Sequence, residues 1–371
     1  MKKNIHEIRD PVHGFVRYSE KERDVINSRP FQRLRHIRQL AMSSYVYPGA
    51  THNRFEHSLG VMELATRIFD SIFDSSKITD GIRQTLPEVI DERALHYYWR
   101  TVVRMAALSH DLGHLPFSHG AEVLLPAGVT HEKFSWDIIL SEEMAPLWDG
   151  LRIKPLDVAK IALGQKEIQK LNLGITLSTW ENILAEIIVG NMFGADRMDY
   201  LLRDSLHAGV AYGRFDHERL VATLRILPKP PEGEGQGEEP AIGVERGGLH
   251  AAAGLIWARY SMFSQVYFHH TRRSYDMHLV EVMKAMFQSG FPAEINDFLR
   301  FTDNDIIVYL RNAAYDDTLT GHDDAKRIEH RNHFRRACWV TSEERNATVG
   351  SALDLLYEAG AQNWTGTHGR Q

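Results

Sequence analysis

Histidine and carboxylate side chains gather in four short elements of the sequence. These elements are Arg54-Phe55-Glu56-His57, His110-Asp111-Leu112-Gly113-His114, His131-Glu132 and Asp196-Arg197-Met198-Asp199-Tyr200. His110 and Asp111 are neighbours at the predicted end of a helix, so both side chains can reach one ion there. One more histidine and one more carboxylate from neighbouring helices would complete a set of two histidines and two aspartates. Such nitrogen and oxygen ligands suit Mn, Fe, Zn or Mg and leave positions for water and substrate oxygens.

His114 follows His110 by four residues, a spacing that places two side chains on the same side of a helix. We therefore expect His114 to lie close to the ion without being needed as a ligand. A simpler interpretation is that the His-Asp pair caps a helix and that its histidine lies on the surface. The presence of all four elements, in this order along the chain, favours a metal site over that interpretation.

The composition is that of a globular protein and excludes several classes. Of 371 residues, 43% are hydrophobic and 25% are charged, which is enough for a sizeable core. The net charge of -6 argues against a general nucleic-acid-binding or membrane-surface protein. A single cysteine, Cys338, excludes a disulfide framework and a multi-cysteine zinc site, and it fits a reducing compartment. The sequence shows neither a signal peptide nor a long apolar run, so we expect a cytoplasmic protein without a membrane span.

The hydrophobic pattern predicts a mostly α-helical protein with a few short strands. Apolar residues recur at spacings of three and four, which is typical of amphipathic helices. Short strands are predicted at Val16–Tyr18 and Ala241–Glu245. Pro30 is expected to break the first helical stretch or to start a turn within it. The predicted helical stretches are residues 17–40, 58–73, 94–112, 132–143, 155–164, 180–203, 216–226, 248–288 and 294–312.

Two segments depart from the helical pattern. Residues 228–240 (PKPPEGEGQGEEP) are too rich in proline, glycine and glutamate to bury side chains, and we interpret them as an insertion. We therefore predict one domain over residues 1–312 that contains this acidic loop. Residues 313–371 are predicted to form a small C-terminal helical extension with a partly disordered end.

The order H…HD…D, formed by His57, His110, Asp111 and Asp196, resembles the HD-domain metal-dependent phosphohydrolases. Within that family, the chain is most similar to the deoxynucleoside triphosphate (dNTP) triphosphohydrolases of animals and bacteria, over roughly residues 5–285. This resemblance implies an HD-domain helical bundle. The motifs that carry it are Asp10-Pro11-Val12-His13-Gly14, Phe31-Gln32-Arg33-Leu34-Arg35, Gln39-Leu40, Tyr47-Pro48-Gly49-Ala50, the segment His52 to Gly60, and the segment His110 to His119.

The resemblance implies roles for seven residues at the reacting centre. A divalent cation (Mn, Fe, Mg or Zn) would be held by His57, His110, Asp111 and Asp196. Acid–base residues near the α-phosphate would be His114, Glu122 and His131. Glu122 stands where the animal enzyme has an aspartate, so its side chain is one methylene longer. Such groups are needed because the departing nucleoside oxygen requires a proton. For His131, the simpler interpretation is a surface histidine beside Glu132.

The resemblance also implies a substrate-binding set. Phosphate contacts would come from Arg54, His119 and Arg197, and Tyr200 would support the nucleoside. Gln39 and Asp204 would bind the 3′-hydroxyl, while Leu40 and Tyr275 would press on the 2′-carbon of the sugar. Core packing remains the alternative for both tyrosines, and a solvated charge remains the alternative for Arg54.

The resulting functional prediction is hydrolysis of a dNTP to a deoxynucleoside and inorganic triphosphate. The predicted binding partners are dNTPs, and the protein is expected to form a homo-oligomer. One alternative is an HD phosphohydrolase that acts on nucleoside monophosphates, cyclic nucleotides or an alarmone. A different class is a catalytically silent regulatory or nucleic-acid-binding scaffold. The complete metal set, together with His114 and His131, argues against such a scaffold, and no nucleic-acid partner is indicated.

Overall fold

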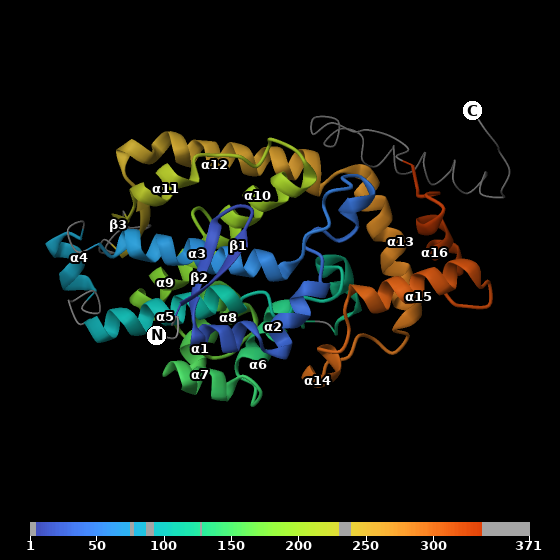
Figure 1. Cartoon of the computed structure of the whole chain (residues 1–371), viewed down its shortest axis with the longest axis horizontal. Coiled ribbons are helices and arrows are strands. Elements are labelled where there is room, and N and C mark those ends of the chain that lie inside the picture. Colours follow the sequence, from blue (N-terminus) through green and yellow to red (C-terminus); the bar gives the residue numbers. More distant parts are fainter. Residues whose placement is uncertain (1–4, 75–77, 87–92, 127, 230–238, 336–371) are drawn as a thin grey trace. The chain divides into compact units, whose positions relative to one another are not determined.

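The computed structural model describes residues 5–74, 78–86, 93–126, 128–229 and 239–335 (Figure 1). Contacts along the chain define two compact units, Met1–His333 and Phe334–Gln371. Only the first is described further. Its described residues are mostly helical, with two small two-stranded antiparallel sheets, which confirms the predicted fold class.

The first unit begins with a hairpin and short helices. Its first elements are β1 (Ile5–Asp10), β2 (Gly14–Ser19), α1 (Glu20–Ile26) and α2 (Arg29–Arg33). The sequence pattern predicts helix over residues 17–40, but the structure divides this stretch. Ser19 ends β2 and caps α1 in a capping box with Glu22, and Pro30 lies in the first turn of α2. The predicted strand at Val16–Tyr18 is confirmed as part of β2.

Helix α3 lies at the centre of this unit and contacts three other long helices, α5, α9 and α10. In Figure 1 it runs through the middle of the molecule, in blue, between α5 and α10. Most of its side chains are buried, including Leu59, Met62 and Phe69. The central helices are α3 (Arg54–Ile72), α5 (Arg93–Ser109), α8 (Pro155–Lys170), α9 (Thr179–Val189) and α10 (Ala195–Ala208).

Shorter elements surround these helices. The remaining α-helices are α4 (Asp80–Thr85), α6 (His131–Ile139), α7 (Ala145–Leu151), α11 (His217–Thr223), α12 (Leu249–Met262), α13 (His270–Met286), α14 (Ile295–Phe298), α15 (Asp303–Tyr315) and α16 (His322–Glu329). A second hairpin consists of β3 (Leu224–Lys229) and β4 (Glu239–Val244). Short 3₁₀ helices cover Leu34–His36, Ala41–Tyr45, Ser118–Leu124 and Arg246–Gly248, and a π-helix covers Phe263–Tyr267.

Several predicted helices are shorter than expected, and glycines explain one division. The stretch 180–203 is divided between α9 and α10. A Cβ on Gly190 would lie 2.3 Å from the carbonyl oxygen of Glu186, and one on Gly194 would lie 2.5 Å from that of Ile188. Only glycine permits such a close backbone turn. The stretch 248–288 is likewise divided between α12 and α13, and the strand Leu224–Lys229 was not predicted.

The C-terminal part of the unit is joined to α13. Helix α16 contacts both α13 and α15, and His278 on α13 pairs with Asp324 on α16 at 2.6 Å. Residues 230–238 of the predicted acidic loop, and residues 336–371 of the predicted extension, lie outside the described residues. Within the described part of the chain, no helix is both long enough and apolar enough to cross a membrane.

Candidate active site

The four predicted metal ligands come from three central elements. His57 lies in the first turn of α3, where a capping box formed by Asn53 and Glu56 begins the helix. Asp196 lies in the first turn of α10. His110 and Asp111 do not continue α5, as the sequence pattern predicted, but lie in the turn that follows its last residue, Ser109. Because α3 contacts both α5 and α10, these helix ends are brought together.

The side chains of this cluster point at one another. The Nε2 atom of His57 lies 3.1 Å from Asp196 Oδ1 and 3.7 Å from Asp111 Oδ2. The Nε2 atom of His110 lies 3.3 Å from Asp111 Oδ1 and 3.6 Å from Asp196 Oδ1. Neighbouring ligands around an ion at about 2.1 Å are separated by roughly 3 Å. The observed separations therefore fit a shared cation.

Burial supports the same conclusion. His57, His110 and Asp111 each offer a ligand atom within 4.8 Å of the others. The Nε2 atom of His110 is buried and has no hydrogen-bond partner among the described residues, whereas its Nδ1 bonds the carbonyl oxygen of Ala107 at 2.8 Å. A buried polar atom without a partner is costly unless an ion satisfies it. The side chain of Asp196 is 34% exposed, so the cluster can be reached from its side.

The local charges favour a cation at this position. Burial alone would lower the pKa of His57, but hydrogen bonds to Asp196 and Asp199 and the charges of Asp199 and Asp111 raise it to about 10. Burial would likewise lower the pKa of His110, which the charges of Asp111 and Asp196 instead raise. Carboxylates that hold a proton on these rings so firmly would also stabilise a divalent ion that replaces it.

Arg54 lies beside the cluster and links it to a loop. Its Nη1 donates to Asp111 Oδ2 at 2.5 Å, while Nε and Nη2 donate to the hydroxyl of Ser118 at 3.0 and 2.8 Å. Burial would raise the pKa of Asp111, but His110, Arg54 and His114 hold it well below its usual range. Asp111 is therefore an anion bound from two sides. The sequence alternative, a solvated Arg54, does not agree with its 5% exposure.

The three predicted acid–base residues also lie together. The imidazole rings of His114 and His131 stack with centroids 4.0 Å apart. His131 begins α6, and its Nδ1 lies 2.5 Å from Glu122 Oε1. The Nε2 atom of His114 lies 3.2 Å from Asp111 Oδ1, which joins this group to the cluster. Burial, together with the positive charges of Arg54 and His131, lowers the pKa of His114 well below its usual range.

Three of the predicted substrate residues lie along α10. Arg197 follows Asp196, and its Nη1 donates to the carbonyl of Gly190 at 3.1 Å, while its buried Nε has no hydrogen-bond partner within the described ranges. Burial and the charge of Asp196 raise the pKa of Tyr200. Asp204 is buried, and its carboxylate is bonded to the side chains of His52 and Tyr267. These three side chains thus extend from the cluster along one helix.

Asp204 is bound by two residues to which the sequence assigned no role. His52 Nε2 lies 2.7 Å from Asp204 Oδ1, and the hydroxyl of Tyr267 donates to Oδ2 at 2.7 Å. Tyr267 lies in the π-helix, a local departure from α-helical geometry that often occurs at functional sites. The sequence signal for His52 was its presence in the segment His52 to Gly60, which carries the family resemblance.

Gln39 and Leu40 lie beside the same segment. The backbone N–H of Gln39 donates to the carbonyl of His52 at 3.0 Å, and no described residue forms a hydrogen bond with the buried side-chain oxygen of Gln39. Leu40 is buried and precedes the 3₁₀ helix Ala41–Tyr45. Tyr275 on α13 packs against Tyr45, with ring centroids 4.6 Å apart. The side chain of His119, a predicted phosphate contact, lies outside the described part of the structure.

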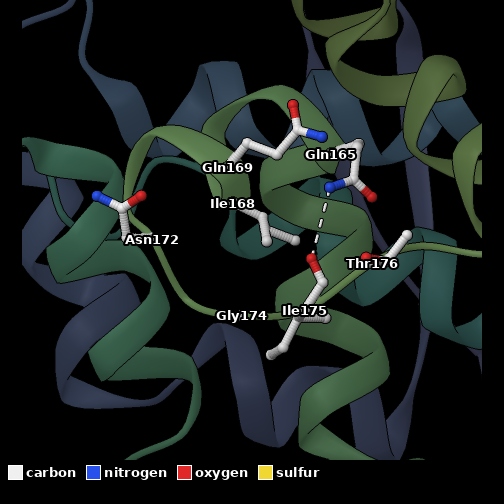
Figure 2. A pocket seen from close by; sticks show the side chains of 7 residues that line it. All are labelled: Gln165, Ile168, Gln169, Asn172, Gly174, Ile175 and Thr176. Carbon is white, nitrogen blue, oxygen red and sulfur yellow. Dashed lines mark hydrogen bonds between the residues drawn. The ribbon is translucent and has the colours of Figure 1, made fainter.

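A surface pocket lies elsewhere, at the end of α8 and in the segment that leads to α9 (Figure 2). Its lining holds no titratable side chain and no residue of the metal cluster. The side-chain N–H group of Gln165 already donates a hydrogen bond to the carbonyl of Ile175 in this pocket. The lining residues are Gln165, Ile168, Gln169, Asn172, Gly174, Ile175 and Thr176. We therefore place the chemistry at the metal cluster and not in this pocket.

Comparison with known families agrees with this geometry. The HD domain matches residues 54–170, a range that begins at Arg54 and includes His57, His110 and Asp111. The HD associated region matches residues 215–355. This chain belongs to the HD-domain family. It is therefore an HD phosphohydrolase, and HD domains bind divalent metals at such clusters.

Two relatives extend the HD-domain match over most of the chain. The uncharacterized protein YwfO of Bacillus subtilis (strain 168) is 30% identical over 95% of this chain and 76% of its own length. A crystal structure of a hypothetical protein from Aquifex aeolicus is similar with a TM-score of 0.73 and 34% identity, over 94% of this chain and 82% of that one.

A named enzyme is similar over a shorter range. The deoxynucleoside triphosphate triphosphohydrolase SAMHD1 of Xenopus laevis is 32% identical over 58% of this chain. The aligned region spans 36% of that relative, so the chain corresponds to about a third of its length. This similarity supports the expected branch of the HD family.

Proposed function

We propose that this protein hydrolyses dNTPs to a deoxynucleoside and inorganic triphosphate, at a divalent cation held by His57, His110, Asp111 and Asp196. The observation that carries the proposal is the contact between this cluster and the group of His114, His131 and Glu122 through Asp111. A cation between two carboxylates would bind phosphate oxygens and stabilise the charge that develops on them. The named relative supports the substrate class.

The acid–base group would handle the proton of the departing 5′-oxygen. The hydrogen bond between His131 and Glu122 places the ring proton of His131 on Nδ1 and fixes the orientation of the ring. His114 is neutral at pH 7 because its pKa is low, so one of its ring nitrogens can donate a proton while the other accepts one. Proton transfer by positioned side chains contributes about 10²–10⁴-fold to such reactions.

The substrate residues would select the sugar. In the described part of the chain, the buried side-chain oxygen of Gln39 has no hydrogen-bond partner. Asp204 is bound by the ring of His52, whose carbonyl accepts from the backbone N–H of Gln39; both residues could accept a bond from a 3′-hydroxyl. Leu40 and Tyr275 are buried side chains that would press on the 2′-carbon. A 2′-hydroxyl against them would lose its water without gaining a partner. Arg54 and Arg197 supply positive charge for the phosphates.

The test is a product analysis with matched substrates. The full-length protein is incubated with each dNTP, each ribonucleoside triphosphate and a deoxynucleoside monophosphate, in the presence of Mn²⁺, Fe²⁺, Mg²⁺ or Zn²⁺. We expect triphosphate and a deoxynucleoside as products, and a higher kcat/KM for dNTPs. Release of pyrophosphate, turnover of the monophosphate alone, or equal turnover of ATP and dATP would reject the proposed substrate class.

A conservative variant tests the sugar pocket separately. Tyr275→Phe removes only a hydroxyl, whereas Tyr275→Ala also opens space at the proposed 2′-position. We expect Tyr275→Ala to relax the preference for dNTPs over ribonucleotides, and Tyr275→Phe to retain it. Thermal unfolding of both variants shows whether the protein remains folded, because truncation of a buried aromatic side chain costs about 3–5 kcal/mol.

A further inference from the structure

A fully buried carboxylate, Asp199, lies behind the metal cluster. It lies on α10 three residues after Asp196 and has no exposed surface. Its Oδ2 lies 2.8 Å from Nδ1 of His57, the ring nitrogen that faces away from the proposed cation. A carboxylate can only accept here, so Nδ1 of His57 carries a proton, and Nε2 is the ring nitrogen left to bind a cation beside Asp111 and Asp196.

Asp199 is itself held by two further side chains. The Nε2 atom of His13 lies 2.6 Å from Oδ1, and Arg203 donates to both oxygens at 2.9 Å through Nε and Nη2. His13 and Arg203 are both fully buried in their side chains. A carboxylate fixed by three partners cannot rotate away from His57. The direction of the His57 ring is therefore determined outside the metal cluster.

The N-terminal hairpin completes this arrangement. Asp10, at the end of β1, accepts a hydrogen bond from Nη1 of Arg203 at 2.9 Å. Its other oxygen accepts from the backbone N–H groups of Val12 and His13 at 2.9 and 2.8 Å. Asp10 thus stabilises the turn that contains His13, and it also binds Arg203, which donates to Asp199. The motif Asp10-Pro11-Val12-His13-Gly14 thereby acquires a physical role at the site.

A glycine on α3 leaves the room that this carboxylate occupies. Gly60 lies three residues after His57, on the same face of the helix. A Cβ at this position would lie 2.1 Å from Asp199 Oδ1 and 2.2 Å from Nη2 of Arg203. Any other residue would push the Asp199–Arg203 pair away from α3. The close approach of α10 to α3 therefore depends on Gly60.

We propose that Asp199 is a positioning residue of the metal centre, which sets the tautomer and the direction of the His57 ring, and that His13 from the N-terminal hairpin holds Asp199 in place. The inference rests on the proposed cation site. Partners of this kind behind a ligand histidine fix its tautomer and its orientation, and their loss commonly weakens metal binding by about 10–100-fold.

The experiment measures metal affinity rather than turnover. The full-length protein is stripped with a chelator and titrated with Mn²⁺ by calorimetry, as wild type, Asp199→Asn and Glu22→Gln. Glu22 is the matched control, because it is also a buried carboxylate bonded to a buried arginine, Arg104 at 2.5 Å, and its other oxygen accepts from the backbone N–H of Ser19 instead of from a residue of the cluster. We expect Asp199→Asn to weaken the Kd for Mn²⁺ by about 10–100-fold, and Glu22→Gln to lower only the unfolding temperature.

Each outcome decides between distinct conclusions. If a folded Asp199→Asn protein binds Mn²⁺ with the wild-type Kd, the positioning role is overturned. It is also overturned if Glu22→Gln weakens Mn²⁺ binding as much as Asp199→Asn does. Absence of Mn²⁺ binding by the wild type would overturn the metal centre itself. If Asp199→Asn does not fold, His13→Phe removes the hydrogen bond to Asp199 while it keeps a ring of similar shape. We expect His13→Phe to raise the Kd for Mn²⁺ above that of the wild type and of Glu22→Gln, and an unchanged Kd would reject the role of the hairpin.

Discussion

Asp111 lies between two groups of side chains, the metal side (His57, His110 and Asp196) and the proton side (His114, Glu122 and His131). Each side contains a buried histidine, and the pKa values of the two histidines are shifted in opposite directions. On the metal side, His57 faces Asp196, Asp199 and Asp111, and its pKa is raised to about 10. On the proton side, His114 also contacts Asp111, but burial and the charges of Arg54 and His131 lower its pKa well below the usual range. Burial opposes the charged form on both sides, so the neighbouring charges decide the outcome.

The two sides also differ in how the chain builds them. The metal side comes from the first turns of α3 and α10 and the turn after α5, and its supporting network is fully buried. The proton side comes from the turn after α5, the 3₁₀ helix Ser118–Leu124 and the first residue of α6, His131. Side-chain bonds, such as those from Arg54 to Ser118, hold this 3₁₀ helix beside the cluster. Two environments side by side would allow histidines of the proposed site to bind a cation and to transfer a proton.

Removal of the shared residue should have the largest effect. Asp111→Ala deletes a proposed metal ligand and the anion between Arg54 and His114, so we expect loss of both bound metal and activity. The measurement is elemental analysis of the purified protein together with steady-state kinetics. Because Arg54 would lose a buried partner, thermal unfolding serves as the control for folding. A stoichiometrically metal-loaded and active Asp111→Ala protein would disprove the assignment.

Removal of a residue on the proton side alone should separate the two functions. We expect His114→Ala to retain metal and substrate binding but to lower kcat by about 10²–10⁴-fold, since the residue acts in the transition state. Metal content, KM and kcat are measured on the same preparation. An unchanged kcat with a raised KM would make His114 a binding residue.

The sequence indicated which residues gather at the candidate site, and their roles stay predictions. The family resemblance named the metal set and the group of His114, Glu122 and His131, and the structure brings these seven residues together. The predicted end of this helix was wrong, however, because the hydrophobic periodicity extended α5 to Leu112. The helix ends at Ser109, and the tertiary contacts of the site hold His110 and Asp111 in a turn. Periodicity describes a buried face but does not fix the last residue of a helix.

The supporting residues could not be derived from local sequence. His13 and Asp199 are 186 positions apart, and their hydrogen bond exists only because the hairpin packs on α10. The spacing of Asp199 from Asp196 places both on one helix face, which was a usable signal. The strand Leu224–Lys229 was missed for a different reason, since its apolar residues continue the helical pattern of α11.

Two carboxylates beside His131 allow a finer test of the proton side. Glu122 Oε1 lies 2.5 Å from His131 Nδ1, whereas Glu132 Oε2 lies 3.4 Å from the same atom. We expect Glu122→Gln to lower kcat by roughly tenfold, because the oriented partner of the histidine is lost. Glu132→Gln is the matched control and should have a smaller effect. Equal effects of the two variants on the pH profile of kcat would mean that general charge, and not the short hydrogen bond, supports His131.

The smallest effect concerns Asp303, a buried carboxylate that supports the proton side from α15. Its oxygens accept hydrogen bonds from the backbone N–H groups of Arg38 and Phe117, at 2.9 and 2.8 Å, and Phe117 precedes the serine that binds Arg54. Burial raises the pKa of Asp303 to about 6, despite these bonds and the nearby charges of Arg38 and Arg33.

This raised pKa predicts a specific change of stability with pH. Between the ordinary pKa of 3.8 and about 6, the folded protein keeps the proton that the unfolded chain has lost. The contribution of Asp303 to the free energy of unfolding therefore falls as the pH rises through this window, by at most about 3 kcal/mol. In Asp303→Asn this contribution is absent, although one backbone N–H loses its acceptor at every pH. Urea unfolding of both proteins from pH 4 to 7 should show that the wild type loses stability relative to the variant as the pH rises. A constant difference would mean that Asp303 is ionised throughout, and that the loop of the proton side is held by a permanent anion.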